Sequence, residues 1–130
     1  MAEHISRKQE LEEGLPHFTG TEEYHRVQQV GKKPVYATDG VKFLCDKAGS
    51  YWLIDVIASH QRNPKVRGED LQTWKLTVAL NKFGVVTCDD GNGSILVRQE
   101  IPYTDFPMSE IVIYAQVDED KIVVMLPGEY

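Results

Sequence analysis

The spacing of apolar residues changes about halfway along this chain, and this change limits the folds open to it. Up to about residue 62 the spacing is helical or irregular, whereas from about residue 71 apolar and polar residues alternate in short runs separated by turn signals. Helices that precede strands, rather than alternating with them, are typical of α+β proteins. We therefore predict N-terminal helices packed on one face of a roughly five-stranded antiparallel meander.

A length of 130 residues leaves room for one domain with one core. A chain of this size buries roughly two-thirds of its unfolded surface, so it needs no disulfide or metal to fold. We expect a single domain over residues 1–130, with a helical or irregular half at about 1–63 and a sheet at about 71–127. Cys45 and Cys88 fall on apolar-facing positions, which indicates buried thiols.

Three segments carry helix signals. A capping box predicts a short helix over residues 6–14. A second helix begins at Thr38 or Asp39 and ends before Gly49, and a third, apolar on nearly every side, runs over 51–61. The second helix has a clean core stripe: Val41, Leu44, Cys45 and Ala48.

Alternating apolar residues predict strands at about 73–80, 85–88, 95–99 and 111–117, and the run between the turn at 118–120 and Pro127 predicts a fifth strand at about 121–126. Turns rich in Asp, Asn and Gly separate several of them. Residues 24–37 leave two interpretations open. They form either a two-stranded excursion around residues 31–34 or a plain loop.

The charge balance argues against a general nucleic-acid binder. The chain has 20 acidic and 14 basic residues and a net charge of −6, whereas a surface that follows phosphates needs a dense basic stripe. The basic residues here are scattered in small groups, which leaves only a local basic contact open: Arg7 with Lys8, Lys32 with Lys33, and Lys65 with Arg67.

The start of the sequence, MAEHISRKQELEEG, lacks the apolar core of a signal peptide. No window approaches the 18 or more apolar residues typical of a membrane span. We therefore expect a cytoplasmic protein without a membrane partner.

Metal and cofactor sites have little support in the sequence. His17 and His25 flank a stretch with Glu22 and Glu23, which makes a transition-metal site conceivable, but ordinary surface histidines explain the same pattern. The run DDGNGS lacks the full calcium-loop pattern and is expected as a hairpin turn. Motifs of nucleotide, dinucleotide and hydrolase sites are absent. We predict neither a metal nor a cofactor.

Two carboxylates offer a possible acid-base pair. Asp39 and Asp105 each follow a threonine with a tyrosine just upstream, Tyr36 and Tyr103 respectively. If the fold brought them together, one carboxyl could raise the pKa of the other. The competing interpretation is structural, since Asp39 can cap a helix and Asp105 can sit in a turn.

The chain resembles a family of small uncharacterised bacterial and phage proteins that carry a domain of unknown function. The segments that carry the resemblance are GLPHFTGTEEYH, YATDGVKFLCDKAGSYWLIDVIASHQ, the strand at Trp74, QEIPYTDFP and VMLPGEY. It implies a single domain, often in mobile-element or phage settings, with no assigned activity. Loop residues at the ends of elements are then the candidate binding site: Phe18, Thr19, Tyr24, His25, Thr38, Asp39, Tyr103 and Asp105.

These observations favour a non-enzymatic protein-binding module, as an inhibitor or adaptor in a phage or mobile-element setting. The alternative is a small enzyme or ligand-binding domain with a polar pocket around Asp39 and Asp105. A closed pocket holding both carboxylates would support the alternative, and an apolar patch or a long edge strand would support association. Two sheet edges also make a homodimer a reasonable expectation.

Overall fold

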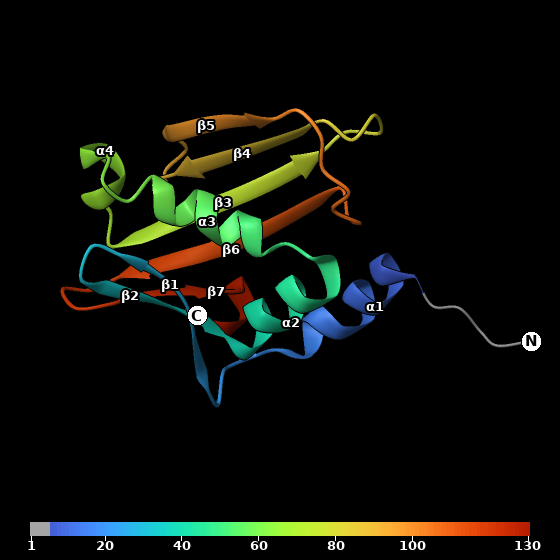
Figure 1. Ribbon diagram of the computed structural model, residues 1–130, viewed down its shortest axis with the longest axis horizontal. Coiled ribbons are helices and arrows are strands. Elements are labelled where there is room, and N and C mark those ends of the chain that lie inside the picture. Colours follow the sequence, from blue (N-terminus) through green and yellow to red (C-terminus); the bar gives the residue numbers. More distant parts are fainter. Residues whose placement is uncertain (1–5) are drawn as a thin grey trace, which may run out of the picture.

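The computed structural model describes residues 6–130, which form one seven-stranded sheet with α2 and α3 lying across one face (Figure 1). The strands are β1 (Tyr24–Val30), β2 (Lys33–Thr38), β3 (Leu71–Val78), β4 (Gly84–Asp89), β5 (Ile95–Ile101), β6 (Glu110–Val117) and β7 (Ile122–Met125). The helices are α1 (Arg7–Gly14), α2 (Asp39–Ala48), α3 (Tyr51–Ser59) and α4 (Pro64–Arg67), with the short 3-10 helices η1 (Leu15–His17) and η2 (Pro127–Glu129).

The α+β class is confirmed, but the predicted five-stranded meander is wrong. The strand order is β1-β2-β7-β6-β3-β4-β5, and β2 pairs with β7 in parallel while the other five pairs are antiparallel. The long connection after β5 carries the chain back past β4 and β3, so β6 pairs with β3 rather than with β5. Alternation along single strands does not contain this information, because it fixes faces and not neighbours.

The two additional strands come from the half that was expected to be helical or irregular. Of the two interpretations of residues 24–37, the structure has the hairpin, in which β1 and β2 are joined at Gly31, whose φ is 58°. β1 is the polar run YHRVQQV at the edge of the sheet and has a bulge between Arg26 and Gln28. An edge strand buries little apolar area, which is why the sequence carries a weak strand signal there.

Local helix signals agree with the structure. Ser6 caps α1 through a 3.1 Å bond from the Gln9 N–H, and Thr38 caps α2. Gly49 ends α2 in the left-handed conformation that glycine adopts without strain. The connection between α3 and β3 contains one further helical turn, α4, which the sequence analysis did not predict.

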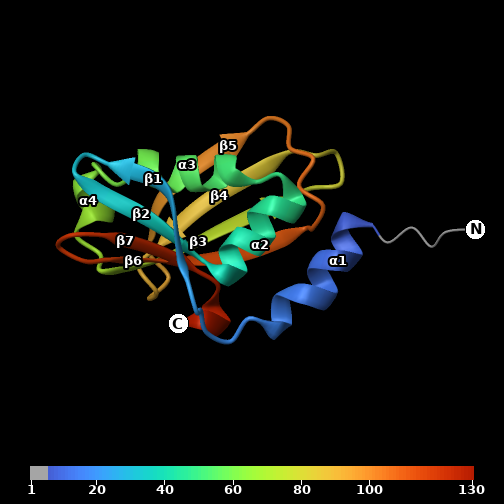
Figure 2. The ribbon, with the colours of Figure 1, turned by 60° about the horizontal axis from the view of Figure 1, so that its bottom comes forward.

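The core lies between the sheet and the helices, and Figure 2 shows α2 on one side of the sheet and η2 near its lower end. Each strand contributes alternate residues to this face, including Ala37, Trp74, Ile113 and Val124. Asp55, the one acidic residue of α3, accepts a 2.7 Å hydrogen bond from Gln28 of β1. No helix within residues 6–130 has the length and apolar character needed to cross a lipid bilayer.

Candidate functional site

The sheet face opposite α2 and α3 carries facing side chains across β2, β7 and β6. Tyr36 of β2 lies opposite Val123 of β7, which lies opposite Gln116 of β6. In the next row, Met125 of β7 lies opposite Tyr114. Residues directly opposite one another point to the same face, so these five side chains form one continuous surface.

A hollow of about 580 Å³ opens above this surface, and we call it the tyrosine groove. Val123 and Met125 are each 5% exposed and form its apolar floor. Tyr24 is 58% exposed on its rim. The full lining is Thr21, Tyr24, Tyr36, Thr38, Gln116, Asp118, Lys121, Val123, Met125 and Glu129.

More aromatic surface lies beside the tyrosine groove. Tyr114 and Tyr130 meet edge to face with ring centroids 5.8 Å apart, a favourable geometry for two rings. The Tyr130 side chain remains largely exposed. Four of the six tyrosines of the chain therefore lie in or next to this one region of the sheet: Tyr24, Tyr36, Tyr114 and Tyr130.

The carboxylate of Glu129 closes one end of the groove by capping α2. It accepts hydrogen bonds from the Thr38 hydroxyl at 2.6 Å, the Gly40 N–H at 3.0 Å and the Leu126 N–H at 3.0 Å. The Asp39 N–H donates to the Thr21 hydroxyl oxygen at 2.8 Å. Since side chains already accept from these N–H groups, the N-terminus of α2 presents no free donors to an anion.

His25 and Asp39 form a contact behind this cap. Nε2 of His25 lies 2.8 Å from Oδ1 of Asp39, and Oδ2 accepts from the Glu22 N–H at 3.0 Å. The hydrogen bond with His25, followed by the bond from Glu22, lowers the pKa of Asp39. The carboxylate is therefore ionised at neutral pH and holds residues 21–23 against the start of α2.

The structure does not bring Asp39 and Asp105 together. Arg7 donates to the carbonyl of Ala48 at 3.3 Å and pairs with the Asp105 carboxylate at 3.6 Å. Asp39 is the first residue of α2 and Ala48 the last, so a helix of about 14 Å separates the two carboxylates. Tyr103 is 68% exposed in the connection that contains Asp105. The hypothesis of an acid-base pair fails because the two loops lie at opposite ends of α2.

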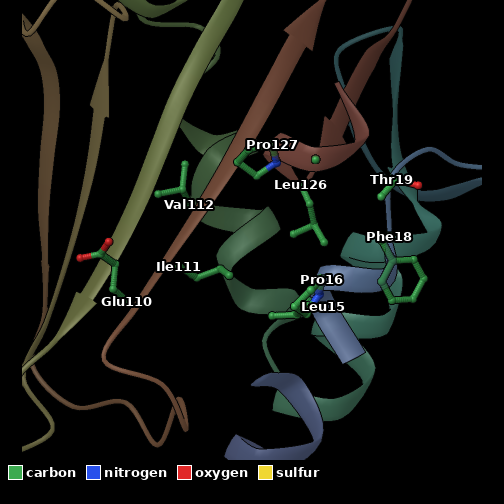
Figure 3. Close-up of a pocket in the computed structure, with 10 residues that line it drawn as sticks. Leu15, Pro16, Phe18, Thr19, Glu110, Ile111, Val112, Leu126 and Pro127 are labelled. Carbon is green, nitrogen blue, oxygen red and sulfur yellow. The ribbon is translucent and has the colours of Figure 1, made fainter. Parts of the chain in front are cut away.

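Phe18 and Thr19 line two smaller hollows near the segment that leads into β1. One, of about 480 Å³, is lined by His17, Phe18, Thr19, Gly20, Thr21, Glu22 and Asp39. Figure 3 shows the other, of about 350 Å³, where the side chains of Ile111 and Leu126 project toward Leu15 and Pro16. The ring of Phe18 packs on Phe43 of α2 with centroids 5.2 Å apart. The half-buried Phe18 side chain therefore packs against α2 and also lines both hollows.

The conceivable metal site at His17 and His25 does not form. Within residues 6–130 there is no group of three His, Cys, Asp or Glu residues placed to hold one ion. His25 is engaged with Asp39 instead.

Residues 9–130 match a family model described as a family of unknown function, DUF6876. The chain belongs to this family. The resemblance to a domain of unknown function that the sequence indicated is therefore confirmed, and the DUF6876 match covers the whole of the sheet and the α2 cap.

A solved structure with a similar fold is described as the protein of unknown function from Enterococcus faecalis. It is 23% identical to this DUF6876 chain, with a TM-score of 0.52, and the match covers 83% of this chain and 98% of that one. This likeness concerns the fold alone. None of the curated proteins matches the chain.

The site residues predicted from the sequence include part of the lining of the tyrosine groove but not its floor. Tyr24 and Thr38 were predicted site residues and line it, whereas Val123, Met125 and Glu129 were not. One signal was available, because the last strand reads IVVML without polar alternation. A strand apolar on both faces indicates that something lies over each face, and here the tyrosines cover the face without helices.

Proposed function

We propose that this DUF6876 protein is a non-enzymatic binding module that holds a segment of a partner protein in the tyrosine groove. The observation that carries the proposal is the apolar floor of Val123 and Met125, bordered by Tyr24 and Tyr36, on the sheet face without helices. A hollow of about 580 Å³ has room for two or three apolar side chains of a partner.

Tyrosine suits such a surface for a physical reason. Its ring supplies a large apolar contact at a small cost in side-chain entropy, and its hydroxyl forms a hydrogen bond at the rim. Tyrosine is enriched in the centres of protein interfaces for this reason. Tyr24 and Tyr130 are 58% and 70% exposed, so both rings are free to gain contacts with a partner.

The carboxylates near the groove support a binding role rather than acid-base chemistry. Glu129 is committed to three donors around α2, and Asp118 lies 3.6 Å from the ammonium of Lys121. General acid-base catalysis needs a titratable group within reach of a substrate proton. An inhibitor or adaptor in a phage or mobile-element setting would use a surface of this kind, and the family resemblance is the reason for naming that setting.

Site-specific photo-crosslinking in the native host tests the proposal. A photoreactive p-benzoylphenylalanine replaces Tyr24 on the groove rim in one variant and Leu80 in the other. Leu80 is fully exposed after β3, away from the groove lining, so it reports non-specific collisions. We expect one discrete protein adduct from position 24 and none from position 80.

The captured partner is then purified and titrated. We expect Tyr24→Ser to weaken its binding by about tenfold or more, as for an aromatic interface anchor, and Leu80→Ser to leave it unchanged. Equal adducts at both positions, no adduct at position 24, or turnover of a substrate that Asp39→Ala abolishes would each contradict the proposal.

A further inference from the structure

A second hollow, which we call the basic hollow, lies at one end of the sheet where the β1–β2 turn, the α3–α4 connection and the β6–β7 turn meet (Figure 1, left). Its volume is about 280 Å³. It is lined by Val30, Gly31, Lys32, Lys33, Gln61, Arg62, Arg67, Val117 and Ile122. Four of these nine residues are basic and none is acidic.

None of the cations of the basic hollow forms an ion pair within the described residues, although the protein is acidic overall. Among residues 6–130, the ion pairs within 4.0 Å involve other basic residues and none of Lys32, Lys33, Arg62 or Arg67. Lys33 donates a 2.7 Å hydrogen bond to a carbonyl oxygen, that of Asp118. In a chain of net charge −6, four such cations around one concave surface create a local positive potential that favours an anion.

The remaining lining is apolar. Ile122 is 2% exposed, and Val30 and Val117 are half-buried beside it. Ile122 faces this hollow, whereas the next residue of β7, Val123, faces the tyrosine groove, so the two sites lie on opposite faces of one strand. A ligand here meets positive charge at the rim and aliphatic surface inside.

The wall that carries Arg62 and Arg67 is fixed by a buried pair of amides. Gln61 and Gln72 donate to each other's side-chain oxygen at 2.8 and 3.0 Å, and Gln72 also donates to the carbonyl of Val66 at 3.0 Å. Both glutamines are buried, and the Trp74 indole donates to Gln72 at 2.9 Å. This network holds the α3–α4 connection on β3, so the wall is ordered before a ligand arrives.

We propose that the basic hollow binds a small organic phosphate, a phosphate monoester that carries a compact apolar group. The phosphate is dianionic near neutral pH and takes charge-assisted bonds from the guanidinium groups of Arg62 and Arg67 and the ammonium of Lys32. The apolar group lies against Val30, Val117 and Ile122. The small volume and the concave shape fit a small molecule and not a long polyanion.

Phenyl phosphate is the probe, with inorganic phosphate and phenol as its two halves. Binding is followed in the full chain by the amide NMR signals of Gly31 and its neighbours and by calorimetry. We expect phenyl phosphate to bind about tenfold more tightly than either half, because only the whole molecule uses both charge and apolar contact. Added salt weakens this binding.

The test uses a double variant that carries both Arg62→Gln and Arg67→Gln. Both side chains are exposed, so their replacement leaves the core intact. We expect at least about a tenfold loss of phenyl phosphate affinity. Arg98→Gln is the matched control, because Arg98 lies on β5 outside the basic hollow and pairs with Glu100. The affinity of this variant for phenyl phosphate should stay within about twofold of the wild-type value.

Three results would overturn the proposal. They are absence of phenyl phosphate binding, affinity no better than that of inorganic phosphate, and an equal loss in the double variant and in Arg98→Gln. Each leaves the tyrosine groove proposal standing, because that groove shares no lining residue with the basic hollow.

Discussion

The hydroxyl of Thr38 donates a 2.6 Å hydrogen bond to Oε1 of Glu129, a residue 91 positions further along the chain. Thr38 also caps α2, with a 3.4 Å bond from the Val41 N–H. The same carboxylate accepts from the Gly40 N–H. The start of α2 is thus built by two distant segments, and one end of the tyrosine groove depends on their contact.

Glu129→Ala should destabilise the fold by about 2–3 kcal/mol, because it leaves donors at the start of α2 without their charged acceptor. Glu129→Gln keeps one acceptor oxygen and should cost less. Urea unfolding followed by circular dichroism measures both. Equal stability of Glu129→Ala and the wild type would show that water replaces the carboxylate at no cost.

Gly40→Ala should destabilise the protein by about 1–3 kcal/mol through overpacking. A Cβ atom at this position would lie 2.6 Å from Oε1 of Glu129 and 2.7 Å from Cδ1 of Leu126. Gly20→Ala is the control, since a Cβ there meets nothing within 4 Å. The melting temperatures of the two variants are measured by thermal unfolding. Equal melting temperatures would contradict the close packing around Gly40.

The hydrogen bond between His25 and Asp39 should be visible as a pH dependence. The folded pKa of Asp39 is lowered, by His25 first and by the Glu22 N–H next. Asp39 therefore contributes stability above its unfolded pKa of about 4, and this contribution is lost as the pH falls through the folded pKa. A carbon NMR titration of the carboxyl group should give a higher Asp39 pKa in His25→Ala than in the wild type.

Asp39→Asn should accordingly be less stable than the wild type at neutral pH, and this difference in stability should disappear in acid. Its melting temperature should lie below that of the wild type at neutral pH and approach it as the pH falls through the lowered folded pKa of Asp39. Asp105→Asn is the control, because that carboxylate is exposed and meets Arg7 at 3.6 Å. A deficit that is constant with pH would mean that the Asp39 charge is not what stabilises residues 21–23.

Both thiols should be unreactive in the folded protein. Burial raises the pKa of Cys45 to about 11 and that of Cys88 to about 12, so at pH 8 only about one Cys45 thiol in a thousand is ionised. A colorimetric thiol reagent should label neither cysteine in buffer and both in denaturant. Ser94→Cys, in an exposed turn, should react at once and serves as the positive control.

We propose that the chain forms a homodimer through the β5 edge of the sheet. The edge of β1 is disrupted by its bulge and by the Gln28 side chain, which accepts from the Gln29 N–H at 2.9 Å. β5 begins with Ile95, which is 59% exposed. Sedimentation equilibrium should show twice the 14.8 kDa mass for the wild type, a monomer for Ile95→Lys and an unchanged dimer for Leu80→Lys. A monomeric wild type would contradict the proposal.

Several elements follow from residues that are close together in the sequence. The stripe from Val41 to Ala48 and the signals at Thr38 and Gly49 give α2 as observed. Alternation gives the strands β3 to β6, and the run between the last turn and Pro127 gives β7, each within a few residues of the observed bounds. For the site, the sequence identified Tyr24 and Thr38, which line the tyrosine groove, and His25 with Asp39, which contact each other. It also grouped Tyr103 and Asp105 with them, and the structure places these two at the far end of α2.

The sequence by itself determined where α2, α3 and the five later strands form, since capping and periodicity depend on residues a few positions apart. Only the tertiary structure decided that β2 lies parallel to β7, because that pairing joins Val35 to Ile122 and has no local signature. Both hollows depend on it. The tyrosine groove combines β1 and β2 with β6 and β7, and the basic hollow combines Lys32 and Lys33 with Arg62 and Arg67. Strand neighbours are chosen by the packing of the whole chain, which no short window of sequence contains.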